Sequence, residues 1–278
     1  MRLFRTAVCV VFVAVTVLFG FLYIKDKITS DSSVPVITVD SELTEVSVKV
    51  TDEGLLEGVT AYDEKDKDLT DKIIIESVSK FTEYGICRVT YAVCDSDNHV
   101  ATATKKIKYT DYKSPQFYAN DSLCFSDKQN IDLTGIIGVG DCIDGDISGN
   151  MILTTQNLTP REIGEYSVQA IVTNGRGDTA TLDIPIIIES KDVDAPDIKL
   201  SEYIVYTDLN QKINPQKYVS EVLDKNGEKT DADVRVKSSV NYSKAGVYTV
   251  DFYADDGNGN EGHTFMTVVV GGGKNEQK

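Results

Sequence analysis

The sequence predicts an all-β protein: three β-sandwich modules in tandem behind one N-terminal membrane helix. The first observation is an eleven-residue stretch that occurs three times, beginning at Gly85, Gly164 and Gly246. Each copy opens on glycine, alternates apolar and mostly polar residues, and closes on Asp or Asn. Alternation with a period of two is typical of a strand that has one face on a core and the other in water.

The second observation is the spacing of these repeats. The three copies are 79 and 82 residues apart, and Pro35, Pro115 and Pro196 open the corresponding units at spacings of 80 and 81 residues. A chain of 278 residues is too long for one ordinary core and suits two or three domains. The repeats therefore predict three modules of similar length, each large enough to fold around its own core.

The third observation is an apolar segment, residues 6–24, which is nineteen residues long and carries no charge. A helix of this length crosses a hydrocarbon core of roughly 30 Å. Arg2 and Arg5 precede the segment, so the positive-inside rule predicts a single-pass anchor with residues 1–5 in the cytoplasm and the C-terminal bulk outside the cell. A cleaved signal peptide is the alternative, although the run is long for one and no A-x-A-like cleavage site follows.

The linkers and the tail define the remaining boundaries. Short polar segments with Ser, Asp or Pro separate the repeated units, and the Gly-rich polar tail is predicted to be disordered. The predicted ranges are 25–33 for the first linker, 34–112, 113–190 and 191–271 for the three modules, and 272–278 for the tail.

The same order of elements recurs within each module. An opening strand follows the proline, and then come an acidic loop or its counterpart, a strand, the repeated strand, a turn and a last alternating strand. Short strands separated by turn signals, with no helical period, indicate a β-sandwich. Tyr166 and Tyr248 lie near the start of the repeated strand, where immunoglobulin-like (Ig-like) sandwiches place a corner tyrosine bonded to nearby backbone. Cys87 takes this position in module one.

At these residues the chain resembles the bacterial surface protein Ig-like domain family, a relative of the hyalin-repeat modules. Module one reads G-V-T-A-Y-D-E-K-D-K-D-L-T at residues 58–70 and A-T-A-T at 101–104, and module two reads G-D-C-I-D-G-D-I-S at 140–148. Module three keeps the repeated strand and a Gly-Asn turn but lacks the acidic loop. The resemblance implies seven-stranded Ig-like sandwiches on a cell surface, and it implies no activity.

The acidic loops are the candidate binding sites. Carboxylates at this spacing suit Ca²⁺, which takes six to eight oxygen ligands, and no other cofactor is expected. In an Ig-like topology the loop lies at the same end of the module as the turn after the repeated strand. The alternative is that the aspartates cap loop amides through their side chains. The candidate ligands are Asp63, Asp66, Asp68 and Asp95 in module one, and Asp141, Asp144 and Asp146 in module two.

Cysteine and histidine offer little for catalysis. Cys124 and Cys142 both fall in module two and form the candidate disulfide. His99 and His263 lie in different modules, each just before a last strand, and are predicted as solvated turn residues. Because the sequence has no recognisable nucleophile motif and no His/Cys spacing of a metal site, it predicts a protein that is not an enzyme.

The net charge of −16 argues against nucleic acid, whose binding needs a basic surface. The sequence therefore predicts a non-catalytic, membrane-anchored extracellular protein that acts as a surface stalk, adhesion or interaction module. Its partner, a protein or a cell-wall or glycan component, is not identified by the residues. The alternative is a ligand-sensing ectodomain that signals through a membrane partner, because residues 1–5 are too few to hold a signalling domain.

Overall fold

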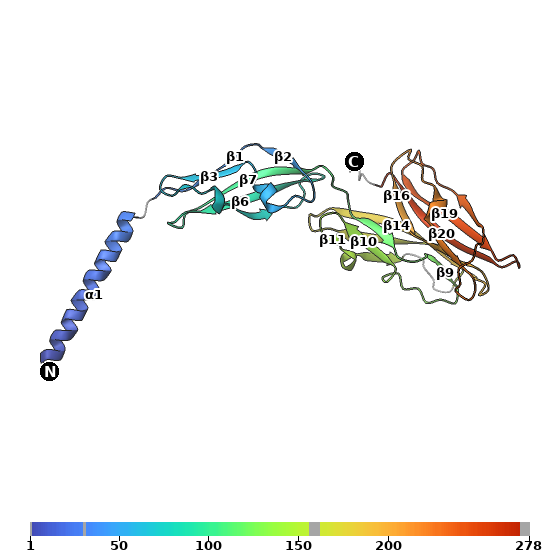
Figure 1. The fold of residues 1–278 in the computed structure, drawn as a ribbon, viewed down its shortest axis with the longest axis horizontal. Coiled ribbons are helices and arrows are strands. Elements are labelled where there is room, and N and C mark those ends of the chain that lie inside the picture. Colours follow the sequence, from blue (N-terminus) through green and yellow to red (C-terminus); the bar gives the residue numbers. More distant parts are fainter. Residues whose placement is uncertain (1, 30–31, 156–161, 273–278) are drawn as a thin grey trace. The chain divides into compact units, whose positions relative to one another are not determined.

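A computed structural model describes residues 2–29, 32–155 and 162–272, and it divides the chain into two compact units. Unit 1, residues 1–110, contains helix α1 (Arg2–Thr29) and module one. Unit 2, residues 111–278, contains modules two and three. The predicted fold class is confirmed: the described chain is mostly β, with three sandwich-like pairs of sheets and one N-terminal apolar helix (Figure 1). The predicted tail beyond Gly272 lies outside the described residues.

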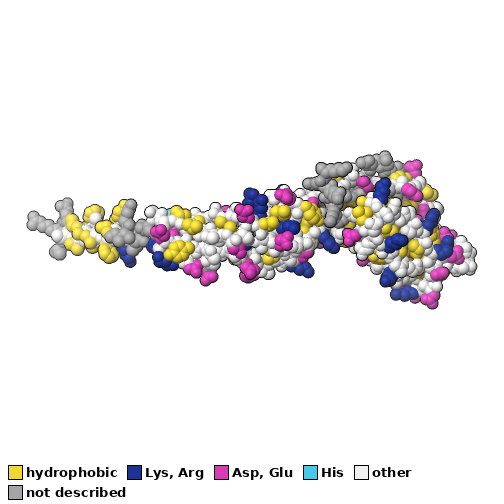
Figure 2. All heavy atoms as spheres, turned by 90° about the horizontal axis from the view of Figure 1, so that it is seen from above, with side chains coloured by type: hydrophobic (Ala, Val, Ile, Leu, Met, Phe, Trp, Pro, Cys, Tyr) yellow, Lys and Arg dark blue, Asp and Glu magenta, His cyan; other side chains and the backbone are white. Residues whose placement is uncertain are grey.

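Helix α1 contains the predicted apolar segment. The stretch Thr6–Lys25 is long enough and apolar enough to cross a membrane, with a mean hydropathy of 2.7, and none of it is buried by the rest of the chain. Figure 2 shows the hydrophobic side chains along this helix. A helix that is apolar on every side needs a nonpolar environment, which a membrane or a signal-sequence receptor supplies.

Module one is a sandwich of two sheets. One sheet holds three strands in the order β1 (Val36–Val39), β3 (Val59–Asp63), β4 (Lys67–Asp68). The other holds four, in the order β2 (Leu43–Val46), β7 (Val100–Tyr109), β6 (Ile86–Cys94), β5 (Ile74–Val78). Two short helices, α2 (Asp52–Leu56) and η1 (Thr70–Lys72), join strands.

Module two repeats this arrangement. Its smaller sheet has the order β11 (Gly145–Asp146), β10 (Ile137–Asp141), β8 (Gln116–Ala119), and its larger sheet β12 (Ile152–Thr155), β13 (Gly164–Thr173), β14 (Thr179–Glu189), β9 (Cys124–Ser126). The turn η2 (Ser148–Asn150) corresponds to η1.

Module three has a smaller sheet of two strands, β15 (Asp197–Leu200) and β17 (Val219–Leu223), and a larger one in the order β16 (Ile204–Thr207), β20 (Glu261–Val270), β19 (Gly246–Asp255), β18 (Val234–Ser238). A short turn, η3 (Pro215–Tyr218), precedes β17. Among the described residues, modules one and two therefore have the seven strands that the resemblance implies, and module three has six. The strand that module three lacks is the short strand that follows the acidic loop in the other modules. The sequence of module three lacks the acidic loop as well.

In every module the opening segment contributes to both sheets. The first strand pairs antiparallel in the smaller sheet, and the next strand pairs parallel with the last strand in the larger sheet: β2 with β7, β9 with β14, and β16 with β20. The chain therefore crosses from one sheet to the other within a few residues.

The repeated strand is a central strand of the larger sheet in each module. Its predicted alternation is confirmed. In β6 the inward residues are Cys87, Val89, Tyr91 and Val93; in β13 they are Val168, Ala170 and Val172; in β19 they are Val250, Phe252 and Ala254; all are buried. Burying one large apolar side chain stabilises a fold by about 1.5–3 kcal/mol, so these strands form the centre of each core.

The Asp or Asn that closes each repeated strand organises the turn after it. In each module Oδ1 of this residue accepts hydrogen bonds from the backbone N–H groups two and four residues ahead. The sets are Asp95 with Asp97 and His99, Asn174 with Arg176 and Asp178, and Asp256 with Asn258 and Asn260. A carboxylate and an amide both supply this acceptor, which explains why either residue closes the repeat.

The predicted corner tyrosines are present. The hydroxyl of Tyr166 donates to the carbonyl of Glu162 at 2.8 Å, and that of Tyr248 donates to the carbonyl of Lys244 at 3.0 Å. Each bond ties the start of the repeated strand to the loop four residues upstream. In module one the corresponding Cys87 is fully buried instead.

Modules two and three pack against each other within unit 2 and contribute to one cluster of buried residues. The backbone N–H of Phe117 donates to the hydroxyl of Tyr206 at 2.9 Å, and burial raises the pKa of this tyrosine to about 12. A second contact joins the hydroxyls of Ser122 and Thr264 at 2.8 Å. At Gly262 in β20 an added Cβ would lie 1.8 Å from the carbonyl oxygen of Pro196. The close approach of these two backbone segments therefore requires glycine at position 262.

Candidate functional site

The acidic loop of module one brings its aspartates together with the turn after β6. Oδ1 of Asp63 accepts from the N–H groups of Lys65 and Asp66 at 2.8 and 2.9 Å, and the bond from Asp66 heads the causes that lower the pKa of Asp63. Asp66 in turn accepts from the N–H of Ser96, across the end of the module, at 2.7 Å. Asp68 accepts from the N–H of the following η1 turn at 3.0 Å.

The turn side of this end is organised by Asp95. Its Oδ1 accepts the two turn amides, and its Oδ2 lies 2.8 Å from Nδ1 of His99. Burial would raise the pKa of Asp95, but the bonds from His99 and Asp97 outweigh burial and lower the pKa. His99 is therefore a turn residue paired with a buried carboxylate.

Module two reproduces the backbone hydrogen bonds of this loop. Oδ1 of Asp141 accepts from the N–H groups of Ile143 and Asp144, each at 2.8 Å, and Oδ2 accepts from the side-chain amide of Asn174 at 2.9 Å. Asp144 accepts from the N–H of Gly175 at 2.5 Å, as Asp66 does from Ser96. Asp146 accepts hydrogen bonds from the backbone N–H and the hydroxyl of Ser148. The bond from the hydroxyl is the largest of the causes that lower the pKa of Asp146.

In modules one and two the predicted aspartates accept hydrogen bonds from protein N–H and O–H groups. Asp66 and Asp144 reach the turn after the repeated strand, whereas Asp68 and Asp146 bond to the turn that follows them. This arrangement favours the capping interpretation, because a carboxylate that accepts several amides satisfies the loop without an ion. Calcium binding at these residues stays a prediction. Among the described residues, the group of His, Cys, Asp and Glu ligand atoms that converges within 4.8 Å lies elsewhere.

The candidate disulfide between Cys124 and Cys142 is not formed, and both are free thiols in the structure. The sheet crossing of the opening segment explains the separation. Cys124 belongs to β9 in the larger sheet, whereas Cys142 follows β10 of the smaller sheet. The thiol of Cys142 instead lies 3.2 Å from the carbonyl oxygen of Lys113.

Cys124 belongs to a polar cluster where modules two and three meet, and we call Cys124, Glu189 and His263 the junction triad. Cys124 comes from β9, Glu189 ends β14 and His263 lies on β20 (Figure 1). Nδ1 of His263 lies 3.7 Å from Sγ of Cys124 and 2.8 Å from a carboxylate oxygen of Glu189. Cys124 is buried, while the side chains of Glu189 and His263 are 27% and 14% exposed.

Three further residues hold the junction triad. Nε2 of His263 lies 3.4 Å from a carboxylate oxygen of Asp251 on the neighbouring strand β19. The ring of Tyr253 stacks on the imidazole, with centroids 4.7 Å apart and an angle of 16° between the planes. The ammonium group of Lys191 donates to the carbonyl oxygen of Cys124 at 2.8 Å. Contacts from both modules therefore fix the position of the imidazole ring.

The charges in this cluster are strongly coupled. Burial alone would lower the pKa of His263, but its hydrogen bonds to Asp251, Cys124 and Glu189 outweigh burial and raise the pKa to about 12. Burial opposes ionisation of Glu189 as well, yet contact with His263 lowers its pKa. Burial raises the pKa of the Cys124 thiol. At neutral pH the cluster is thus an imidazolium between two carboxylates, beside a protonated thiol.

Sequence reasoning missed the junction triad. Its members are 65 and 74 residues apart and belong to two modules, so they show no local spacing. The sequence predicts His263 as a solvated turn residue, whereas it lies within β20, opposite Tyr253. Strand alternation places Asp251, Tyr253 and His263 on one outward face of module three, and that is the signal the sequence contains. It carries nothing about which surface covers that face.

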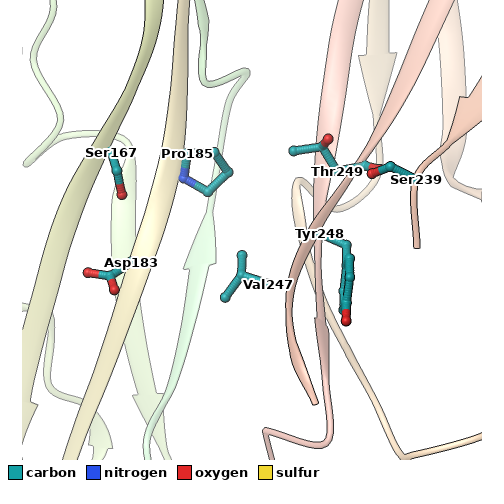
Figure 3. Close-up of a pocket in the computed structure, with 7 residues that line it drawn as sticks. All are labelled: Ser167, Asp183, Pro185, Ser239, Val247, Tyr248 and Thr249. Carbon is teal, nitrogen blue, oxygen red and sulfur yellow. The ribbon is translucent and has the colours of Figure 1, made fainter. Parts of the chain in front are cut away.

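Two open grooves also occur in the described chain. One, of about 300 Å³, lies between modules two and three, and Figure 3 shows its two walls. Its lining residues are Ser167, Asp183 and Pro185 from module two, and Ser239, Val247, Tyr248 and Thr249 from module three. The other, of about 520 Å³, lies in module one, where the buried ammonium of Lys105 pairs with Asp40 at 2.9 Å. Neither groove is lined by the junction triad.

Comparison with known sequences assigns no family. No family model matches the chain, so the resemblance to the bacterial surface Ig-like family stays a prediction. An uncharacterized 81.3 kDa protein of Acholeplasma phage L2 is 30% identical over 137 residues, which are 48% of this chain and 18% of that protein. The pesticidal crystal protein Cry22Aa of Bacillus thuringiensis is 26% identical over 216 residues, 76% of this chain and 29% of that protein. The chain thus spans less than a third of either relative.

Solved structures with similar stretches are multi-domain proteins. The M60 catalytic domain with two CBM51 domains from Clostridium perfringens ZmpB matches with a TM-score of 0.24 and 15% identity, over 87% of this chain and 31% of that one. Drosophila N-cadherin EC1-4 matches with a TM-score of 0.23 and 13% identity, over 87% of this chain and 76% of that one. The tandem β-sandwiches and the N-terminal apolar helix are features of the structure itself.

Proposed function

We propose that this protein is a single-pass membrane protein whose β-sandwich modules act outside the cell as a non-catalytic interaction module. The observation that carries the proposal is that two features occur together in one chain. Helix α1 presents the exposed apolar stretch Thr6–Lys25, and tandem sandwiches come directly after it. A helix of this kind holds the sandwiches at a membrane surface, and tandem sandwiches present turns and sheet faces to partners.

The relatives support modular use. Cry22Aa matches over 76% of this chain but only 29% of its own length, as expected when such modules are parts of longer proteins. The proposed partners are a surface protein or a cell-wall or glycan component, and the acidic chain is suited to partners with a basic surface. We assign no catalytic role to either histidine, because neither belongs to a recognisable nucleophile motif in the sequence.

The anchor is tested by expressing the full chain with a C-terminal tag in a bacterial host and fractionating the cells. The expected product pellets with membranes after alkaline wash, is digested by protease added to intact spheroplasts, and keeps Met1. Replacing Val13 and Val17 with arginine should release it, because each charge costs about 2.5–3.5 kcal/mol at the centre of a membrane helix. Val193→Arg is the matched control, since Val193 is 82% exposed in the segment between β14 and β15.

A mature N-terminus beyond residue 24 would show that the apolar helix is a cleaved signal sequence, and protection of the tag from protease would reverse the proposed topology. The interaction role is tested by displaying the full chain densely on beads in detergent, where avidity strengthens weak contacts. Wall glycans, surface proteins and membrane extracts are offered. Specific capture of a wall or surface component supports the interaction module, whereas capture only of a membrane protein favours the sensing ectodomain.

A further inference from the structure

The junction triad brings three different ligand atoms to one point. The Cys124 sulfur, a Glu189 carboxylate oxygen and a His263 ring nitrogen all lie within 4.8 Å of one another. Two ligands that are about 2.0–2.3 Å from a tetrahedral metal lie about 3.3–3.7 Å apart. The 3.7 Å between Sγ and Nδ1 fits this separation. The 2.8 Å between Nδ1 and Glu189 is a hydrogen bond, and a metal ion would take the place of its proton.

The chemistry of the three ligands selects the ion. Ca²⁺ and Mg²⁺ prefer oxygen ligands, whereas sulfur, imidazole nitrogen and carboxylate oxygen together suit Zn²⁺. We propose that Cys124, Glu189 and His263 bind one Zn²⁺ ion, with water as the fourth ligand. A thiolate, a carboxylate and a neutral imidazole together balance the charge of Zn²⁺, which suits a place that is largely shielded from water.

The residues around the junction triad support metal binding independently of the ligands. In protein metal sites the ring nitrogen of histidine that does not face the ion usually donates to a carboxylate, which fixes the tautomer and the ring plane. Asp251 is in this position at Nε2 of His263, and Tyr253 stacks on the ring. These contacts direct Nδ1 of His263 toward Cys124 and Glu189.

A nucleophilic cysteine is the strongest alternative. Cys124, His263 and Asp251 follow the order of a Cys-His-acid triad, in which histidine takes the thiol proton. However, Cys124 is only 3% exposed, and burial raises the pKa of its thiol. The carboxylate of Glu189 and the thiol of Cys124 contact the same ring nitrogen, Nδ1 of His263, so the carboxylate would repel a thiolate. A cation at this point removes that repulsion, which favours a metal site over a nucleophile.

Zn²⁺ in this position would join modules two and three. Cys124 and Glu189 come from adjacent strands of module two, β9 and β14, and His263 comes from β20 of module three. Coordination would add bonds across an interface that otherwise depends on packing and hydrogen bonds such as Ser122 to Thr264. The ion would thus fix the orientation of modules two and three relative to each other.

The test uses the full chain in detergent, freed of metal by chelation and then titrated with Co²⁺, which replaces Zn²⁺ and reports its ligands. The expected spectrum has a thiolate-to-cobalt band in the near ultraviolet and the visible bands of a tetrahedral ion, saturating at one metal per chain. Zn²⁺ should bleach both bands. Competition with a chromogenic chelator then gives the Zn²⁺ affinity.

The variants separate ligands from their surroundings. Cys124→Ser should remove the near-ultraviolet band, and His263→Gln should weaken Zn²⁺ binding by more than about a hundredfold. Asp251→Asn should weaken it by about 10–100-fold, the usual effect of a residue that orients a metal-bound histidine. Cys142→Ser and His99→Gln are the matched controls and should bind like the wild type.

Three results would overturn the proposal: no stoichiometric Co²⁺ or Zn²⁺ binding by the wild type, binding without the thiolate band, or wild-type affinity in Cys124→Ser. The wild-type spectrum alone decides the first two, so the test does not depend on the variants folding. Rapid alkylation of Cys124 by iodoacetamide in the metal-free protein, unchanged by Zn²⁺, would instead support the nucleophile.

Discussion

The carboxylate of Glu189, the last residue of β14 in module two, lies 2.8 Å from Nδ1 of His263 in module three. This contact joins two modules that the sequence presents as separate repeats. Asp251 contacts the other ring nitrogen at 3.4 Å, so the imidazole lies between two carboxylates.

The first prediction concerns this ion pair. In the metal-free protein His263→Gln should lower the free energy of unfolding by about 1–3 kcal/mol near pH 6, because a partly buried charge pair loses one partner. The folded pKa of His263, about 12, lies above its ordinary value of 6.5. The contribution of the protonated His263 side chain to the free energy of unfolding is therefore complete below about pH 6.5. It is lost progressively as the pH rises toward about 12.

The measurement is thermal unfolding of wild type and His263→Gln from pH 6 to 9 with chelator present, which should show the difference in Tm shrinking as the pH rises. Glu189→Gln, which keeps the shape and removes the charge, should reproduce part of the loss. A Tm difference that stays constant across this range would mean that His263 contributes packing rather than charge.

The second prediction concerns Gly262, where β20 contacts Pro196, the residue before β15. Gly262→Ala should destabilise unit 2 by about 1–3 kcal/mol or more, because a Cβ there would lie 1.8 Å from the backbone carbonyl of Pro196. Gly140→Ala is the control: Gly140 also lies in a strand, and a Cβ there meets nothing within 4 Å. Urea unfolding of both variants gives the free energies, and equal stabilities would show that the backbone at Pro196 moves freely away from β20.

The third prediction concerns the turn residue Asp256, whose pKa is lowered to about 2, chiefly by the N–H of Asn258 and the side chain of Asn260. Its charge therefore stabilises the fold above about pH 3.8, and this contribution is lost as the pH falls toward about 2. Asp256→Asn keeps the acceptor that Asn174 supplies in module two, so it should be milder than Asp256→Ala at pH 7.

Nuclear magnetic resonance titration of the Asp256 carboxyl measures this pKa directly, and acid unfolding compares the variants. The exposed Asp233→Asn serves as the control for removing one negative charge. An Asp256 pKa near 3.8 would be incompatible with the bonds to the turn amides.

The fourth prediction separates the two interpretations of the acidic loops. If the carboxylates cap amides, a Ca²⁺ chelator should leave the Tm unchanged, and Asp144→Ala should lower it equally with and without Ca²⁺, because the bond to Gly175 is lost in both cases. Differential scanning calorimetry of the full chain in detergent makes the comparison. A Tm that rises with Ca²⁺ in the wild type and not in Asp144→Ala would establish calcium binding instead.

The sequence determined the features that depend on neighbouring residues. Alternation over the repeated strands predicted which side chains are buried, since successive residues of a strand point to opposite faces. The glycine and Asp or Asn that frame each repeat predicted the strand ends, because turn geometry is set within four or five residues. The corner tyrosines were predicted because Ig-like sandwiches place such a residue at the start of this strand. Their bonds are local too, since Tyr166 and Tyr248 donate to carbonyls four residues upstream.

The tertiary structure decided what depends on contacts between modules. Alternation places His263, Tyr253 and Asp251 on an outward face of module three, but it does not specify that β9 and the end of β14 cover this face. The sequence pairs Cys124 with Cys142 because both belong to module two, whereas the crossing of the opening segment places them in different sheets. Strand patterns fix the face on which a residue lies, and only the packing of whole modules determines which residues from elsewhere in the chain meet it.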